Sequence, residues 1–221
     1  MQWGVGPART PASSPIEGGL GQRRRVRDRV VEDGIDADVT TRPLASNVNF
    51  SPGQTVPNRV VVPLSASGAM DVANAQGATD VIVDVTGYYT STSTGYFEAL
   101  APARICDTRP TAVSGLTDAC SGHTLAAGGT LVVPVTGEGG VPTTAAGVVA
   151  NVTVTNTTGQ SYLTVYPGGT AQPLASDLNW TPGLTVPNLV VAELGATGAL
   201  GVFNAAGSTD VIVDVSGWFT G

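Results

Sequence analysis

The sequence has no lysine, one histidine and two cysteines, and charged residues make up only 12% of its 221 positions. From residue 43 onward it contains three arginines and eleven acidic residues, and the other seven arginines fall within residues 1–42. A nucleic-acid-binding surface needs clustered basic side chains. This balance therefore excludes nucleic acid as a partner for the body of the protein.

Long apolar runs are also missing. No stretch of about 18 apolar residues is present, so the sequence predicts no insertion into a membrane. The first 21 residues contain no continuous apolar core and lack the pattern of a signal peptide. Valine, threonine, alanine and glycine are abundant instead, and this composition favours short strands joined by tight turns over helices.

The two cysteines lie 14 positions apart in a turn-rich stretch. We predict a disulfide between Cys106 and Cys120, which indicates an oxidising compartment; two unrelated thiols are the alternative. A metal site is disfavoured, because only His123 is available to join the two cysteines. His123 has no matching nucleophile motif and is predicted to lie in a surface loop.

An internal repeat organises the chain. Residues 43–90 align without a gap onto residues 173–220, an offset of 130, and 30 of these 48 positions are identical. Apolar positions stay apolar, as at Phe50 and Trp180 or Tyr88 and Trp218. Turn residues also stay turn residues. The repeat is therefore a duplicated structural unit.

The second copy belongs to a complete module over residues 93–221. Period-2 alternation and valine-rich runs predict nine strands there. They span residues 96–100, 104–106, 130–135, 147–155, 162–166, 177–180, 188–194, 199–203 and 210–219. This many short strands without a helical period predict an all-β fold, an antiparallel β-sandwich of the jelly-roll-like kind.

The first copy, in residues 43–92, matches only the second half of that module. Residues 1–42 contain no recognisable first half. They are a disordered leader, an irregular replacement for the missing strands, or a segment that is not the natural upstream sequence. A small sheet alone is marginally stable, so we expect the half module to pack against the complete module, to pack against another chain, or to be poorly ordered.

The heptapeptide TDVIVDV occurs twice, at residues 79–85 and 209–215, and each copy contains two aspartates. Aspartates four positions apart on a strand share a face but stand about 13 Å apart. That separation is too long for a shared proton, for the carboxylate pair of a glycoside hydrolase or for one metal ion. We predict instead that the aspartates form the outward polar face of a terminal strand.

Two further groups of side chains are candidates for binding. Asp107 is predicted to cap a turn and to pair with a nearby arginine, Arg104 or Arg109, whereas binding of a carboxylate or sugar by the three is the alternative. Aromatic side chains can stack on sugars, although most here are predicted to lie in the core. The candidates for stacking are Trp180, Trp218 and Tyr88.

Several stretches together resemble a β-rich repeat module of secreted and surface proteins from actinobacteria. They are ARICDTRP, YLTVYPGGTAQPLASDLNW, TVPNLVV and GSTDVIVDVSGWF, with LAAGGTLVVPVTGEGGVPTTAAGVVANVTVTN between the first two. The resemblance covers residues 95–221 fully and residues 43–90 in part. It implies an extracellular or cell-surface location and a non-catalytic role, without a ligand or cofactor whose binding residues could be transferred.

Two functions follow as expectations. The first is a non-enzymatic structural, adhesion or spacer module. The alternative is a carbohydrate- or cell-wall-binding module accessory to a secreted enzyme. The corresponding partners are polysaccharide or cell wall, the neighbouring module, or a second chain bound through the half module. A hydrolase is disfavoured, because no nucleophile and base or pair of acids can be assembled from the sequence.

Overall fold

The computed structural model describes residues 34–37, 47–89, 95–115 and 118–221. The chain divides into two compact units. One contains Gly53–Arg59 and Asp84–Gly221, and the other contains Val60–Val83 and the described residues before Gly53. Of the predicted leader at residues 1–42, only residues 34–37 are described, and the rest lies outside the described residues.

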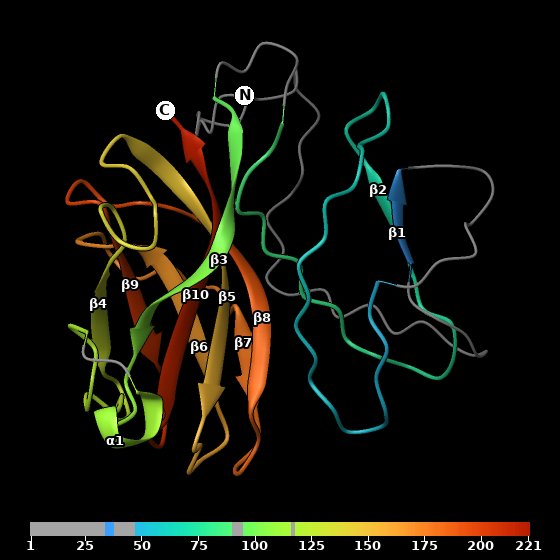
Figure 1. The fold of residues 1–221 in the computed structure, drawn as a ribbon. Coiled ribbons are helices and arrows are strands. Elements are labelled where there is room, and N and C mark those ends of the chain that lie inside the picture. The colour runs from blue at the N-terminus through green and yellow to red at the C-terminus, as the bar shows by residue number, and fades with distance from the viewer. Residues whose placement is uncertain (1–33, 38–46, 90–94, 116–117) are drawn as a thin grey trace. The chain divides into compact units, whose positions relative to one another are not determined.

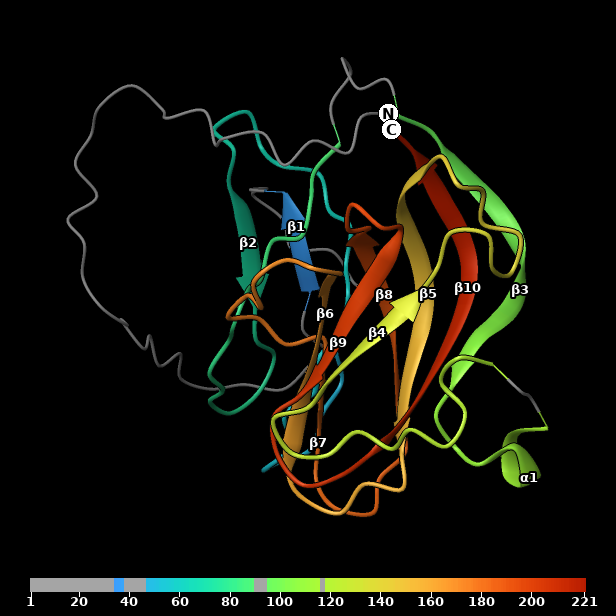
Figure 2. The same ribbon diagram turned by 90° about the vertical axis from the view of Figure 1, so that its left-hand side faces the viewer.

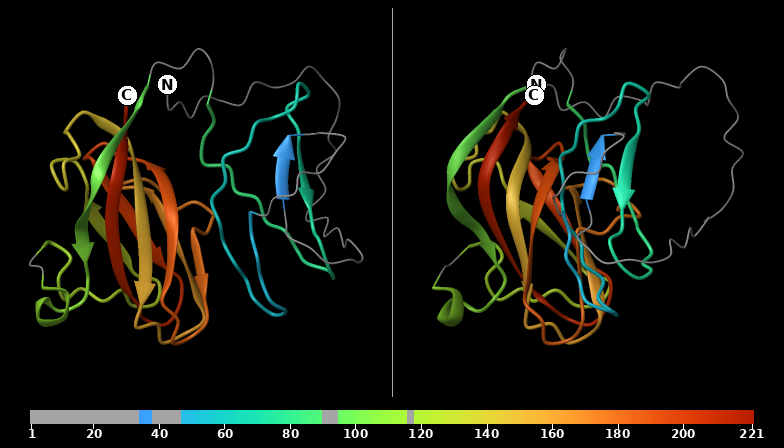
Figure 3. Two further views of the ribbon diagram at one scale, coloured as in Figure 1. Left: turned by 45° about the vertical axis from the view of Figure 1, so that its right-hand side comes forward. Right: turned by 90° about the vertical axis from the view of Figure 1, so that its right-hand side faces the viewer.

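Eight strands in residues 97–220 form two antiparallel sheets of four (Figure 1). One sheet has the order β3-β10-β5-β8, and these strands lie side by side in green, red, yellow and orange in the left panel of Figure 3. The other has the order β4-β9-β6-β7, with β4 and β9 in front in Figure 2. The bounds are β3 (Phe97–Asp107), β4 (Thr130–Pro134), β5 (Ala145–Thr155), β6 (Ser161–Pro167), β7 (Leu178–Trp180), β8 (Val186–Glu193), β9 (Ala199–Asn204) and β10 (Asp210–Thr220).

The order of the strands is that of a jelly roll. Counted along the chain from β3, the first sheet contains strands one, eight, three and six, and the second contains two, seven, four and five. This alternation of strands between two sheets is the double Greek key of the jelly roll. The predicted all-β, antiparallel sandwich is therefore confirmed. The strands predicted at residues 96–100 and 104–106 are one continuous strand, β3.

The core lies between the two sheets and follows the alternation in the sequence. On β5, every second residue from Val148 to Val154 is fully buried, and on β10 Val211, Val213 and Val215 are buried in the same way. Leu163, Leu178 and Leu200 from the opposite sheet join the same cluster. Burial of each such side chain contributes about 1.5–3 kcal/mol to folding. The short helix α1 (Thr111–Ser114), which the sequence did not predict, follows β3.

The two halves of the module interdigitate. Strands β3 to β6 come from the first half and β7 to β10 from the second, which is the repeated part. Within each sheet, strands from the two halves alternate, so no two strands of the second half are neighbours. A second half therefore obtains its ladder hydrogen bonds from a first half, because its own strands never pair with one another.

The first copy of the repeat has almost none of these strands. Among the described residues 47–89, only β2 (Met70–Ala73) is a strand, and it pairs antiparallel with β1 (Gly34–Ala37). β1 is the only part of residues 1–42 that the structure describes. The heptapeptide at residues 79–85 is not a strand, and Ile82 is 85% exposed whereas its counterpart Ile212 on β10 is 7% exposed.

No helix in the described part of the chain is long and apolar enough to cross a bilayer.

Candidate functional site

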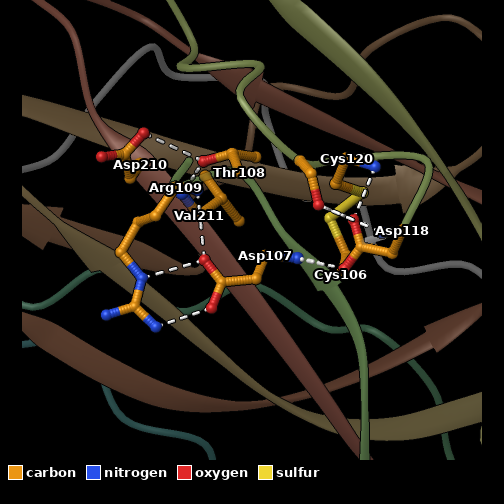
Figure 4. The surroundings of a disulfide bond; sticks show 9 residues. Cys106, Asp107, Thr108, Arg109, Asp118, Cys120, Asp210 and Val211 are labelled. Carbon is orange, nitrogen blue, oxygen red and sulfur yellow. Dashed lines mark hydrogen bonds and ion pairs between the residues drawn. A yellow bond between two sulfur atoms is a disulfide. The ribbon is translucent and has the colours of Figure 1, made fainter. Parts of the chain in front are cut away.

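The predicted disulfide is present and anchors the loop that follows β3. Cys106 lies near the end of β3 and Cys120 lies beyond α1, with their Cα atoms 5.4 Å apart. Both residues are buried in the core cluster. Figure 4 shows the bond beside Asp107 and Asp118. Asp118 accepts hydrogen bonds from the backbone N–H groups of Asp107 and Cys120, at 3.0 and 2.7 Å, so the carboxylate holds the two sides of the disulfide loop together.

Asp107 is fully buried and paired with two arginines. Its Oδ1 accepts hydrogen bonds from the backbone N–H and the Nε of Arg109, at 3.1 and 2.9 Å. Its Oδ2 accepts from Arg109 at 2.6 Å and from Arg104 at 3.2 Å. The predicted turn cap and ion pair are both confirmed. Burial alone would raise the pKa of Asp107, but the hydrogen bonds and charge of Arg109, with the charge of Arg104, hold that pKa below its ordinary value.

Arg104 also ties β3 to β10 through Asp214. Its Nε and one terminal nitrogen donate to the two oxygens of Asp214, at 2.7 and 3.2 Å. This paired geometry is the strong form of an arginine–carboxylate contact. Hydrogen bonding to Asp214 raises the pKa of Arg104. One aspartate of the repeated heptapeptide therefore joins two strands.

The other aspartate, Asp210, is buried, and the prediction that it lies on an outward face was wrong. It accepts hydrogen bonds from the hydroxyls of Thr108 and Thr124, at 3.1 and 2.7 Å, and from the Asn156 amide at 2.8 Å. β10 is a central strand rather than an edge strand, and segments from three distant parts of the chain meet at its first residue. No sequence pattern links these donors, so only the fold reveals them.

A third buried carboxylate, Asp177, was not identified in the sequence. Its Oδ2 accepts from the Val165 N–H at 2.8 Å, and its Oδ1 accepts from Arg59 at 2.6 Å. Arg59 belongs to Gly53–Arg59 and donates through Nε to the Leu189 carbonyl at 3.1 Å. Burial raises the pKa of Asp177 above its ordinary value, although the Val165 and Arg59 contacts oppose that rise.

Replacement of Asp177 by asparagine, the residue at the equivalent position 47, should flatten the pH dependence of stability. A raised pKa in the folded protein means that Asp177 favours folding below its unfolded pKa of about 3.8 and that this contribution is lost as pH rises through the folded pKa. Each unit of rise corresponds to about 1.4 kcal/mol. Urea unfolding between pH 3 and 8 measures the effect. Arg59→Ala should act oppositely and steepen the dependence, and equal slopes in all three proteins would contradict the prediction.

The predicted stacking residues do not come together. Trp180 on β7 is a core residue, so its ring offers no face to a sugar, and Trp218 on β10, in the other sheet, is half-buried against the core. Tyr88 is exposed. A different pair, Tyr162 on β6 and Phe203 on β9, has ring centroids 6.2 Å apart, with Tyr162 exposed.

The described residues contain no group of three or more histidine, cysteine, aspartate or glutamate side chains that could hold a metal ion. His123 is exposed, as predicted. Comparison with protein-family models, with curated proteins and with solved structures gives no match. These charged residues hold parts of the chain together through hydrogen bonds and ion pairs. The carboxylates each accept hydrogen bonds from protein groups, and Arg104 joins β3 to β10.

Proposed function

We propose that the eight-strand module is a non-catalytic adhesion or display element that acts outside the cell. The observation that supports this most is the use made of its charged side chains. Asp107, Asp210 and Asp214 hold β3, β10 and the disulfide loop together through hydrogen bonds and ion pairs. The disulfide itself is the kind of bond that persists in oxidising compartments.

The two ends of the module favour display over a spacer role. β3 and β10 are antiparallel neighbours, and Phe97 is the partner of Phe219. The Tyr96 N–H donates to the Thr220 hydroxyl at 2.7 Å, and the Thr220 N–H donates to the Tyr96 carbonyl at 2.9 Å. The chain thus enters and leaves the module at the same end. A module with this geometry projects from a longer chain and adds little to its length.

The second candidate is a carbohydrate-binding module, and the Tyr162–Phe203 pair favours it. The two rings lie on neighbouring strands of the β4-β9-β6-β7 sheet, and an exposed aromatic on a sheet surface is suited to stacking against a sugar ring. Tyr162 contributes the exposed ring of the pair.

A binding and turnover assay on the full chain separates the candidates. For the display role we expect no retention on insoluble polysaccharides or isolated cell walls beyond that of an inert control protein, and no turnover of glycosides, esters or peptides. Retention that Tyr162→Ala reduces by about threefold to tenfold, the range for one aromatic contact, would replace the display role by carbohydrate binding. Leu189→Ala, which alters an exposed apolar side chain elsewhere, is the matched control. Turnover would overturn both candidates.

A further inference from the structure

The chain contains two second halves and one first half of the same jelly roll. Residues 43–90 and 173–220 share 30 of 48 positions, while residues 97–167 supply the only set of first-half strands that the structure describes. Since each strand of a second half needs first-half neighbours, only one copy can be folded into the sandwich at a time. We propose that residues 43–90 compete with residues 173–220 for this first half, so that the chain has a second folded form in which the order of its halves is reversed.

The apolar positions of the first copy fit the sandwich. The buried hydrophobic residues of the second copy all have apolar counterparts 130 positions earlier. Val81, Val83 and Val85 are exposed, whereas their counterparts on β10 are fully buried. The other matching pairs are Val48 and Leu178, Phe50 and Trp180, Val60 and Val190, Val62 and Ala192, Leu64 and Leu194, Met70 and Leu200, Val72 and Val202, and Tyr89 and Phe219.

The turns of the first copy already have the conformation found in the second. The Ser65 N–H donates to the Ala69 carbonyl at 3.0 Å, and the Gly195 N–H donates to Ala199 at the same distance. Gly68 and Gly198, at the same place in this turn, have φ of 77° and 70°. Likewise the Asn74 amide donates to the Gly77 carbonyl at 3.1 Å, as Asn204 does to Gly207 at 3.2 Å. These two turns therefore keep their local structure in both copies, whereas most of the strands form only in the second copy.

Chain connectivity allows the exchange within one molecule. Phe219 is the β10 partner of Phe97, so Tyr89 would take that position. Seven residues separate Tyr89 from Phe97. If Thr90 also pairs with Tyr96, as Thr220 does, five residues remain, which is the upper length of common hairpin loops. β2 would leave β1 and enter the place of β9, between β4 and β6.

Two residues explain why the second copy occupies the sandwich in this structure. A side chain at Gly195 would collide with the backbone of Gly168, and the first copy has Ser65 there. A Cβ at Gly201 would lie 2.8 Å from the ring of Tyr166, and the first copy has Asp71 there. Both misfits weaken the first copy as a competitor and leave the rest of its pattern intact.

Hydrogen exchange of the full chain, followed by mass spectrometry of separate peptides, tests the proposal. In the wild-type protein we expect the β10 amides to be protected and those of residues 80–89 to exchange fast. Ser65→Gly with Asp71→Gly removes both misfits and should speed exchange of the β10 amides by about a hundredfold, about tenfold for each steric misfit relieved. Adding Gly195→Ser and Gly201→Asp should transfer protection from β10 to residues 80–89 while β3 and β5 stay protected.

Matched variants show which of the two copies is folded into the sandwich. Val83→Asp in the fourfold variant should abolish the protection of residues 80–89, whereas Val213→Asp should leave it. Two results would overturn the proposal. One is an unchanged rate of hydrogen exchange at the β10 amides in the double variant. The other is loss of β10 protection in the fourfold variant without any gain of protection at residues 80–89. Native mass spectrometry of the fourfold variant should find a monomer. If residues 80–89 were protected only in dimers or larger assemblies, they would be paired with the first half of another molecule, and the proposed form within one molecule would be overturned.

Discussion

Phe219→Ala is expected to lower the free energy of unfolding of the jelly roll by about 3–5 kcal/mol. The Phe219 side chain is 2% exposed, next to the end of β10, and its ring centroid lies 5.4 Å from that of Phe97. Loss of the ring would leave a cavity in an interior that cannot collapse fully, because β10 is held by strands on both sides. Urea unfolding followed by tryptophan fluorescence, to which the buried Trp180 contributes, measures the change.

The repeat provides a matched control for this prediction. Tyr89 occupies the equivalent position in the first copy and is 47% exposed. Tyr89→Ala should therefore change the stability of the jelly roll by no more than about 0.5 kcal/mol, as exposed substitutions usually do. Equal losses in the two variants would show that the first copy contributes to this core as much as the second, contrary to the structure.

Removal of the disulfide by Cys106→Ala and Cys120→Ala is expected to cost about 3 kcal/mol. The bond closes a loop with a sequence separation of 14, and cross-linking a loop of this length restricts the unfolded chain by about that amount. Because the loop contains Asp118 and precedes Thr124, its hydrogen bonds to Asp107 and Asp210 should loosen as well.

Thermal and urea unfolding in the presence and absence of reductant measure the contribution of the disulfide. The wild-type protein should lose about as much stability on reduction as the double variant has lost already, and the double variant should not respond to reductant. Wild-type stability that is the same in both conditions would contradict the prediction. Asp118→Asn, with both cysteines present, isolates the hydrogen bonds of the loop from the covalent bond.

The sequence was informative wherever the structure depends on local pattern. Alternation of apolar and polar residues placed β4 to β10 to within a few residues, because a strand with one face in a core must repeat every second position. The Asp107 turn cap could be predicted because its acceptor and donor lie two residues apart. The Cys106–Cys120 bond was predictable because no other cysteine is available.

What the sequence left open depends on partners distant along the chain. The three donors to Asp210 come from Thr108, Thr124 and Asn156, and the contact of Arg59 with Asp177 joins positions 118 residues apart. Neither set of contacts could be predicted from a pattern in neighbouring residues of the sequence. Trp180 and Trp218 look equally suitable for stacking in the sequence, and only the sandwich distinguishes a core ring from a half-buried one.

The two copies of TDVIVDV show most directly what the sequence determines and what only the tertiary structure determines. The sequence by itself determined that this heptapeptide suits a strand and that its two aspartates are too far apart to form a catalytic pair. Tertiary structure alone decided that residues 209–215 lie in a central strand region and residues 79–85 do not. The physical reason is that a strand is completed by the backbone groups of its neighbours. β3 and β5 provide those groups for one copy at a time.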